Sequence, residues 1–118
     1  MDLQSLLRAV ISFRDERDWA QYHNPKDLAI SLSLEAAELL EIFQWKSPEE
    51  VQAMKSDEQA CRRVKEELGD VLIYALNLAN EFTFDPAEVV LEKLAINGRK
   101  YPVEKAKGRA DKYSAYEE

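Results

Sequence analysis

Residues 28–45 read LAISLSLEAAELLEIFQW, and this stretch decides the fold. Most of its residues are apolar or small, which predicts a largely buried helix. Glu35 falls in the middle of an apolar stripe on this helix, and Glu38 lies on its edge, if successive residues turn by about 100°. Because a buried carboxylate is costly unless something neutralises it, we expect Glu35 to meet a basic side chain, a shared proton or a bound cation. The stripe consists of Leu28, Leu32, Leu39 and Ile42.

Helix-start signals divide the rest of the chain. A capping side chain precedes proline at Asn24-Pro25, Ser47-Pro48 and Asp85-Pro86, which is typical of a helix N-terminus. With short connections and little strand-like alternation, the sequence predicts an all-α protein, a four-helix bundle. The wide apolar faces of the second and third long helices predict oligomerisation through helix packing. The long helices are expected at about residues 2–17, 25–45, 57–82 and 86–98, with a short helix after Ser47.

Length and composition limit the function classes. The chain has 118 residues, which suits one domain over residues 1–104 with a loosely ordered tail over 105–118. Its net charge of −7 argues against a nucleic-acid partner. Cys61, the one cysteine, cannot form an internal disulfide, and the first residues do not resemble a signal peptide. No uncharged run reaches membrane-spanning length. We therefore expect a cytoplasmic protein without a membrane partner.

The third long helix carries a second acidic pair. Glu67 sits beside its apolar stripe, and Asp70 follows three residues later, so both face the same way. Tyr74, Asn77 and Glu81 continue the row that Asp70 begins. Two helices with two carboxylates each can bring four negative charges together, and these repel at low dielectric. A hard divalent cation, Mg²⁺, resolves that repulsion, and such a site suits phosphoryl or nucleotidyl chemistry.

Simpler interpretations stay open at this point. Acidic pairs occur on many solvated helices, and basic neighbours such as Arg62 and Lys65 could pair with Glu58 and Glu66 along the surface. We assign the remaining acidic residues of these segments, Glu41, Glu49, Glu50 and Glu66, to solvated or supporting positions. A di-iron bundle needs two Glu-x-x-His motifs, and the single histidine, His23, lies outside both helices. A purely structural bundle would leave Glu35 unexplained.

Glu-x-x-Glu, 28 intervening residues and Glu-x-x-Asp resembles the pattern of the MazG-like, all-α nucleoside triphosphate pyrophosphohydrolase superfamily. Three segments resemble its dCTP pyrophosphatase subgroup: RDWAQYHNPKDLAISLSLEAAELLEIFQWK (17–46), EELGDVLIYALNLA (66–79) and NGRKYP (97–102). The resemblance spans roughly residues 13–113. It implies Mg²⁺-dependent hydrolysis of a nucleoside triphosphate to a monophosphate and pyrophosphate, with dCTP or related dNTPs favoured, in nucleotide-pool clean-up.

The resemblance also assigns roles to residues. Glu35, Glu38, Glu67 and Asp70 would bind the metal, and Glu38 would orient or deprotonate the attacking water. It further implies a homo-oligomer, either a tetramer built as a dimer of dimers or a dimer. The alternatives are a non-catalytic bundle that binds nucleotide or metal as a regulator, and a phosphoribosyl-ATP or dUTP pyrophosphohydrolase.

The substrate contacts come from the same resemblance. Trp45 would either hold the base or fill the core, and His23 would contact the nucleotide or lie on the surface. Val10 stands where dCTP pyrophosphatases carry a histidine near the base, so a broader dNTP range or a modified nucleotide remains open. The implied substrate-binding residues are Trp19, Trp45 and Tyr74 toward the base, His23 toward the nucleotide, and Lys93, Asn97, Lys100 and Tyr101 toward phosphate and sugar.

Overall fold

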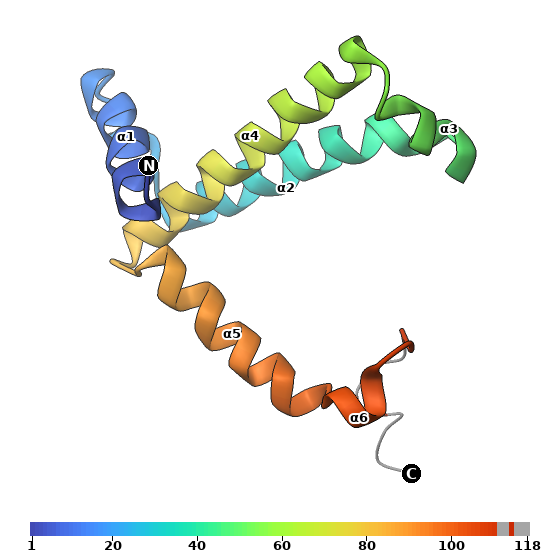
Figure 1. Ribbon diagram of the computed structural model, residues 1–118. Coiled ribbons are helices and arrows are strands. Elements are labelled where there is room, and N and C mark those ends of the chain that lie inside the picture. The colour runs from blue at the N-terminus through green and yellow to red at the C-terminus, as the bar shows by residue number, and fades with distance from the viewer. Residues whose placement is uncertain (111–113, 115–118) are drawn as a thin grey trace. The chain divides into compact units, whose positions relative to one another are not determined.

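The computed structural model describes residues 1–110 and 114 (Figure 1). This part of the chain contains helices and no strand, which confirms the predicted all-α class with four long helices. Residues 111–113 and 115–118 of the predicted tail lie outside the described residues. The elements are α1 (Leu3–Glu16), the 3₁₀ helix η1 (Ala20–Tyr22), α2 (Pro25–Phe43), α3 (Pro48–Met54), α4 (Glu58–Glu81), α5 (Pro86–Lys100) and α6 (Val103–Ala106).

The helices begin where the capping signals predicted. Asn24 accepts a hydrogen bond from the Asp27 amide at 2.9 Å before α2, and Ser47 and Glu50 form a reciprocal capping box at α3. Helix ends were less well predicted: α2 stops at Phe43, two residues before Trp45, and α5 continues past Gly98. The 3₁₀ helix η1 carries no strong local signal and was not predicted.

The described residues belong to two compact units, Met1–Thr83 and Phe84–Glu118. In the first unit, α2 and α4 run antiparallel and pack against each other, while α1 packs against α4 and α3 lies beside α4 (Figure 1). The second unit contains α5, capped by Asp85, and the short α6. None of the helices described is long and apolar enough to cross a membrane.

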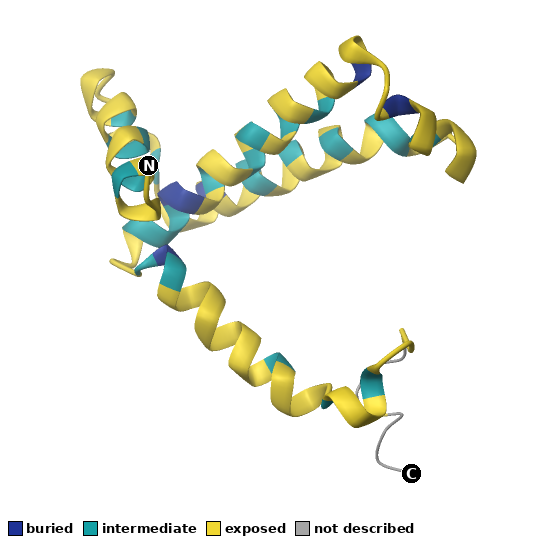
Figure 2. Ribbon diagram, viewed as in Figure 1, coloured by how far each residue is buried: buried dark blue, intermediate teal, exposed yellow. Residues whose placement is uncertain are grey.

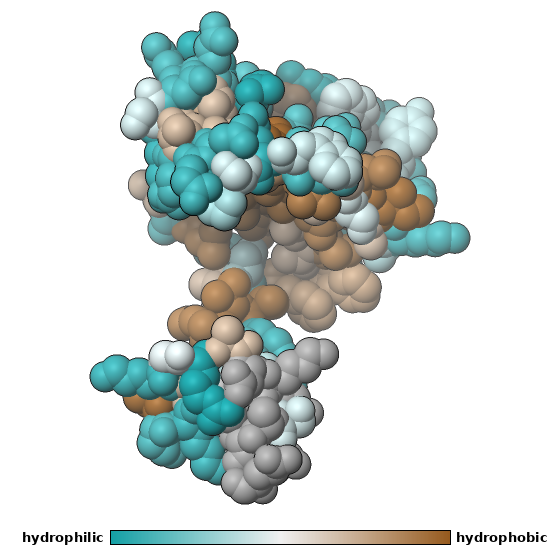
Figure 3. Space-filling model, turned by 90° about the vertical axis from the view of Figure 1, so that its right-hand side faces the viewer, coloured by the Kyte–Doolittle hydropathy of each residue, from teal (hydrophilic) through white to brown (hydrophobic). Residues whose placement is uncertain are grey.

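Few side chains are buried within a single chain (Figure 2). Leu28 at the start of α2 is 1% exposed and is the largest fully buried side chain. By contrast, Leu34 on α2 and Leu72 on α4 are 61% and 54% exposed. Figure 3 shows brown, apolar side chains gathered on the surface beside a mainly hydrophilic region that faces the viewer. Among the described residues, the buried apolar ones are Leu28, Met54, Ala60, Leu76 and Pro86.

Substitutions of Leu28 test whether its side chain is buried in the core. We expect Leu28→Ala to lower the free energy of unfolding by about 2–5 kcal/mol, because it leaves a cavity between packed helices. Leu28→Met keeps the volume and should cost less than about 1.5 kcal/mol. Urea unfolding followed by circular dichroism measures both. Equal losses for the two variants would contradict the burial assigned to this side chain.

Candidate functional site

Three carboxylates meet between α2 and α4. Glu35 and Glu38 come from α2 and Glu67 from α4, and one oxygen from each lies within 4.8 Å of the other two. Glu35 and Glu67 are half-buried, and Glu38 is exposed. In the described part of the chain, no basic side chain forms an ion pair with any of them. Of the three ways to neutralise Glu35, a shared proton and a bound cation therefore remain.

Oxygen atoms in this cluster lack partners. Oε2 of Glu35 and Oε2 of Glu67 are both buried without a hydrogen bond. Two ionised carboxylates offer no donor to each other, and a shared proton or a bound cation would satisfy such oxygens. An all-carboxylate donor set with orphaned oxygens fits a hard divalent cation such as Mg²⁺.

The electrostatics of the cluster favour a retained proton when no metal is bound. Burial raises the pKa of Glu35 to about 7, and hydrogen bonds with Glu38 and Glu67 and the charges of Glu38 and Asp70 add to this effect. For Glu67, the hydrogen bond with Glu35 lowers the pKa, but partial burial and the charges of Glu38 and Asp70 outweigh it, so its pKa is also raised. A cation entering the cluster must therefore displace this proton.

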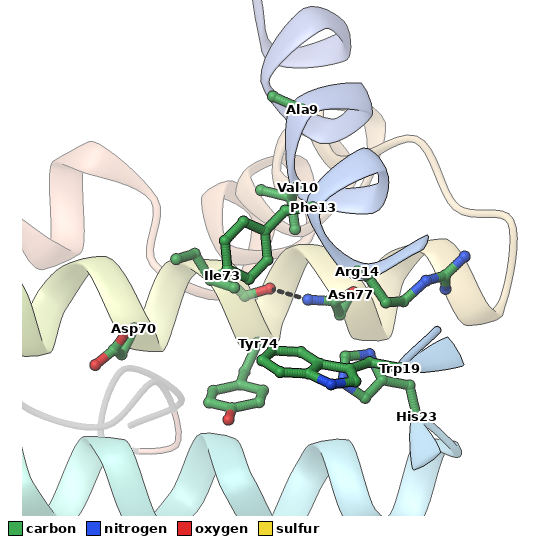
Figure 4. Close-up of a pocket in the computed structure, with 10 residues that line it drawn as sticks. All are labelled: Ala9, Val10, Phe13, Arg14, Trp19, His23, Asp70, Ile73, Tyr74 and Asn77. Atoms are coloured by element: carbon green, nitrogen blue, oxygen red, sulfur yellow. Dashed lines mark hydrogen bonds between the residues drawn. The ribbon is translucent and has the colours of Figure 1, made fainter. Parts of the chain in front are cut away.

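Asp70 connects the cluster to a pocket. It lies three residues after Glu67 on α4, and its charge acts on both Glu35 and Glu67. It also lines a neighbouring cavity of about 390 Å³, a size typical of small-molecule sites. Figure 4 shows this pocket, which is lined by Ala9, Val10, Phe13 and Arg14 of α1, by Trp19 and His23, and by Asp70, Ile73, Tyr74 and Asn77 of α4.

Aromatic rings form one side of this pocket. The rings of Phe13 and Trp19 meet edge to face with centroids 5.9 Å apart, and the Arg17 guanidinium lies 3.6 Å from the Phe13 centroid. His23 contributes a buried Nδ1 that has no hydrogen-bond partner. The pocket thus combines flat apolar surfaces with a few polar atoms, which is typical of a site that holds an aromatic ring.

The structure gathers some predicted residues and not others. Trp19, His23 and Tyr74 line the pocket, beside Asp70. Trp45 follows α2, is 86% exposed and does not line it, so within a single chain it does not fill the core either. The four residues expected at phosphate and sugar belong to the second unit, and their roles stay predictions: Lys93, Asn97 and Lys100 lie on α5, and Tyr101 caps it.

Sequence reasoning missed several lining residues. Phe13 and Ile73 look like ordinary core positions of their helices, so no local signal distinguished them. Asn77 did carry a signal, because it lies in the same row of α4 as Asp70 and Tyr74. A second cavity, of about 420 Å³, adjoins the carboxylates, and Arg63 is the one basic residue of its lining. The other lining residues are Glu38, Glu41, Ile42, Glu66 and Glu67.

Comparison with known proteins gives concordant matches. A sequence model of the MazG-like family matches residues 30–115. dCTP pyrophosphatase 1 from Bos taurus is 42% identical over 114 residues, and the Homo sapiens protein of that name is 38% identical over 112 residues. Each alignment covers 95% of this chain but 66% of the relative, so the chain spans about two thirds of their length. A crystal structure of a pyrophosphatase from Archaeoglobus fulgidus is 46% identical with a TM-score of 0.74, covering 85% of this chain and 92% of that one.

The pKa of Glu35 gives a test in metal-free protein. Between pH 4.5 and 7 the folded chain holds a proton that the unfolded chain releases, so the free energy of unfolding should fall as pH rises through this range. Glu35→Gln should flatten this fall, because glutamine does not ionise. Denaturant unfolding in the presence of a chelator, at several pH values from 4.5 to 8, measures the effect.

Glu81→Gln is the matched control, since Glu81 is exposed on α4 outside the cluster and the pocket. It should keep the pH dependence of the parent protein. A parent protein and a Glu35→Gln variant with the same pH dependence would show that Glu35 does not retain the proton.

Proposed function

The chain belongs to the MazG-like family, and from this we propose that it is a nucleoside triphosphate pyrophosphohydrolase that uses Mg²⁺. It would cleave the bond between the α and β phosphates to give a nucleoside monophosphate and pyrophosphate. One observation carries the proposal: a carboxylate cluster suited to a divalent cation adjoins an aromatic pocket through Asp70. The metal chemistry and the nucleoside would therefore be held side by side.

Glu35, Glu38, Glu67 and Asp70 would hold the metal. When bound, Mg²⁺ offsets the negative charge of the phosphates and makes a water ligand more acidic. Glu38 is the exposed member of the cluster, which supports its role in orienting the attacking water and accepting its proton. The water oxygen bonds to the α phosphorus while the bond to the bridging oxygen breaks, and pyrophosphate leaves with that electron pair.

The pocket would hold the base. Trp19 and Tyr74 offer ring faces on which any base can stack, and stacking contributes about 1–3 kcal/mol per base. His23 adds a polar contact. Because relatives at about 40% identity are named dCTP pyrophosphatase 1, we favour dCTP and related dNTPs as substrates. Lys93, Asn97, Lys100, Tyr101 and Trp45 would complete the contacts to phosphate, sugar and base.

The protein would act as a homo-oligomer, a tetramer or a dimer, in cytoplasmic nucleotide-pool clean-up. The exposed apolar side chains on α2 and α4 support this proposal, because single soluble chains rarely leave large apolar faces in water.

A substrate panel tests the activity. The protein is incubated with dNTPs, with Mg²⁺ or with chelator, and the products are separated by ion-exchange chromatography. We expect monophosphate and pyrophosphate with Mg²⁺ and no turnover with chelator. Glu38→Gln and Asp70→Asn should each lower kcat/KM by about 100-fold or more, because a proton acceptor or metal ligand is lost.

Glu81→Gln should leave kcat/KM unchanged, since this carboxylate lies on α4 outside the cluster and the pocket. Release of orthophosphate with a nucleoside diphosphate would contradict the proposed reaction. Nucleotide binding without turnover would favour the regulatory alternative.

The assembly has its own test. Light scattering coupled to gel filtration should give a mass of two or four chains, and Leu34→Asp or Leu72→Asp should lower it, because a charge in an apolar interface is costly. Ser33→Asp, beside Leu34 but at an exposed polar position, should not. A parent protein that stays monomeric at micromolar concentration would contradict the proposal.

A further inference from the structure

Asn77 differs from every other residue that lines the aromatic pocket. It is 2% exposed, and it is the one buried residue of the lining. The others, including Trp19, His23 and Tyr74, are half-buried or exposed. Asn77 is therefore the most enclosed residue of the lining, on α4 one turn beyond Tyr74 and two turns beyond Asp70 (Figure 4).

Its amide group has a fixed orientation. Nδ2 donates a hydrogen bond to the Ile73 carbonyl oxygen at 3.0 Å, shown dashed in Figure 4. A carbonyl only accepts, so the nitrogen must face Ile73 and the oxygen must face away. Oδ1 is then buried without any hydrogen-bond partner. The unpartnered polar atom of this pocket-lining residue is therefore an acceptor and not a donor.

This arrangement does little for the fold. The Ile73 carbonyl is already the helical partner of the Asn77 backbone N–H, so the side-chain bond reaches no other helix. A buried acceptor without a partner destabilises the folded chain, and an apolar residue of similar size would avoid that cost. The chain thus carries a costly polar atom where packing alone does not need one, which points to a ligand.

We infer that Asn77 Oδ1 accepts a hydrogen bond from an exocyclic amino group of the base, and so selects amino-bearing bases over their keto counterparts. The inference rests on the proposed function, and it identifies the exocyclic amino group as the part of the substrate that the pocket recognises. A keto base would bring its oxygen against Oδ1, and two buried acceptors would face each other without a proton.

The other polar groups of the pocket are less able to distinguish an amino group from a keto oxygen on the base. The Arg14 guanidinium is held by Asp15, with Nε 2.9 Å from its Oδ1. The imidazole of His23 can donate or accept through its unpartnered Nδ1, so it does not favour one base. Val10 supplies no hydrogen bond. The Asp70 carboxylate also only accepts, but it is assigned to the proposed metal site. Apart from Asp70, Asn77 is the lining residue whose unpartnered atom can only accept.

The matched pair dCTP and dUTP isolates the amino group, since cytosine carries an amino group where uracil carries an oxygen. For purines, dATP and dITP give the same comparison. We expect the parent protein to have a higher kcat/KM for the amino member, and Asn77→Leu to reduce that preference tenfold or more. Asn80→Leu, one turn further along α4 and outside the pocket lining, should keep it.

Thermal unfolding separates this role from a structural one. Asn77→Leu should be at least as stable as the parent, because it removes an unsatisfied buried acceptor. A parent protein with no preference or a keto preference would overturn the inference. An Asn77→Leu variant that keeps the preference would also overturn it. So would a variant whose kcat/KM falls by the same factor for the amino and the keto substrate.

Absence of turnover in the parent protein would refute the proposed function but not this inference. Calorimetric binding of dCMP and dUMP then decides it. Tighter binding of dCMP by the parent, lost in Asn77→Leu and kept in Asn80→Leu, would support the role of Asn77. Equal binding of both nucleotides by the parent would overturn it.

Discussion

Crowded negative charge between α2 and α4 is the constraint on which the first unit depends. Glu35, Glu38 and Glu67 bring oxygens within 4.8 Å of one another, and among the described residues no basic side chain forms an ion pair with them. The packing of the two helices holds the carboxylates together despite their repulsion. Repulsion between these carboxylates therefore destabilises the folded chain. A bound proton reduces this repulsion in part, and a divalent cation reduces it more fully.

Features of the fold that depend on neighbouring residues in the sequence were predicted correctly. Asn24, Ser47 and Asp85 predicted helix starts because a cap joins residues only two or three positions apart. The acidic pairs were predicted to share faces because residues three apart on a helix are neighbours. Helix ends were less predictable, because Trp45 and Gly98 carry no comparably strong stop signal.

The pocket could not be derived in the same way. It exists because α1 packs against α4, and no spacing within either helix reveals that contact. In the sequence, Phe13 resembles an ordinary core residue. Only the structure shows that its ring packs against Trp19. Asn77 was visible as part of a polar row, but only tertiary packing showed that its oxygen is buried and without a partner. Sequence predicted the cluster better than the pocket because each acidic pair lies within one helix.

Helix α4 contributes to the carboxylate cluster and to the aromatic pocket at different points along its length. Glu67 lies in the carboxylate cluster and Asn77 lines the pocket, ten residues or about 15 Å further along the axis. The side-chain hydrogen bond of Asn77 stays within α4 and links it to no other helix. With base selection at Asn77 as inferred, a single substitution at one end of α4 would change which bases are accepted and leave the carboxylates at the other end in place.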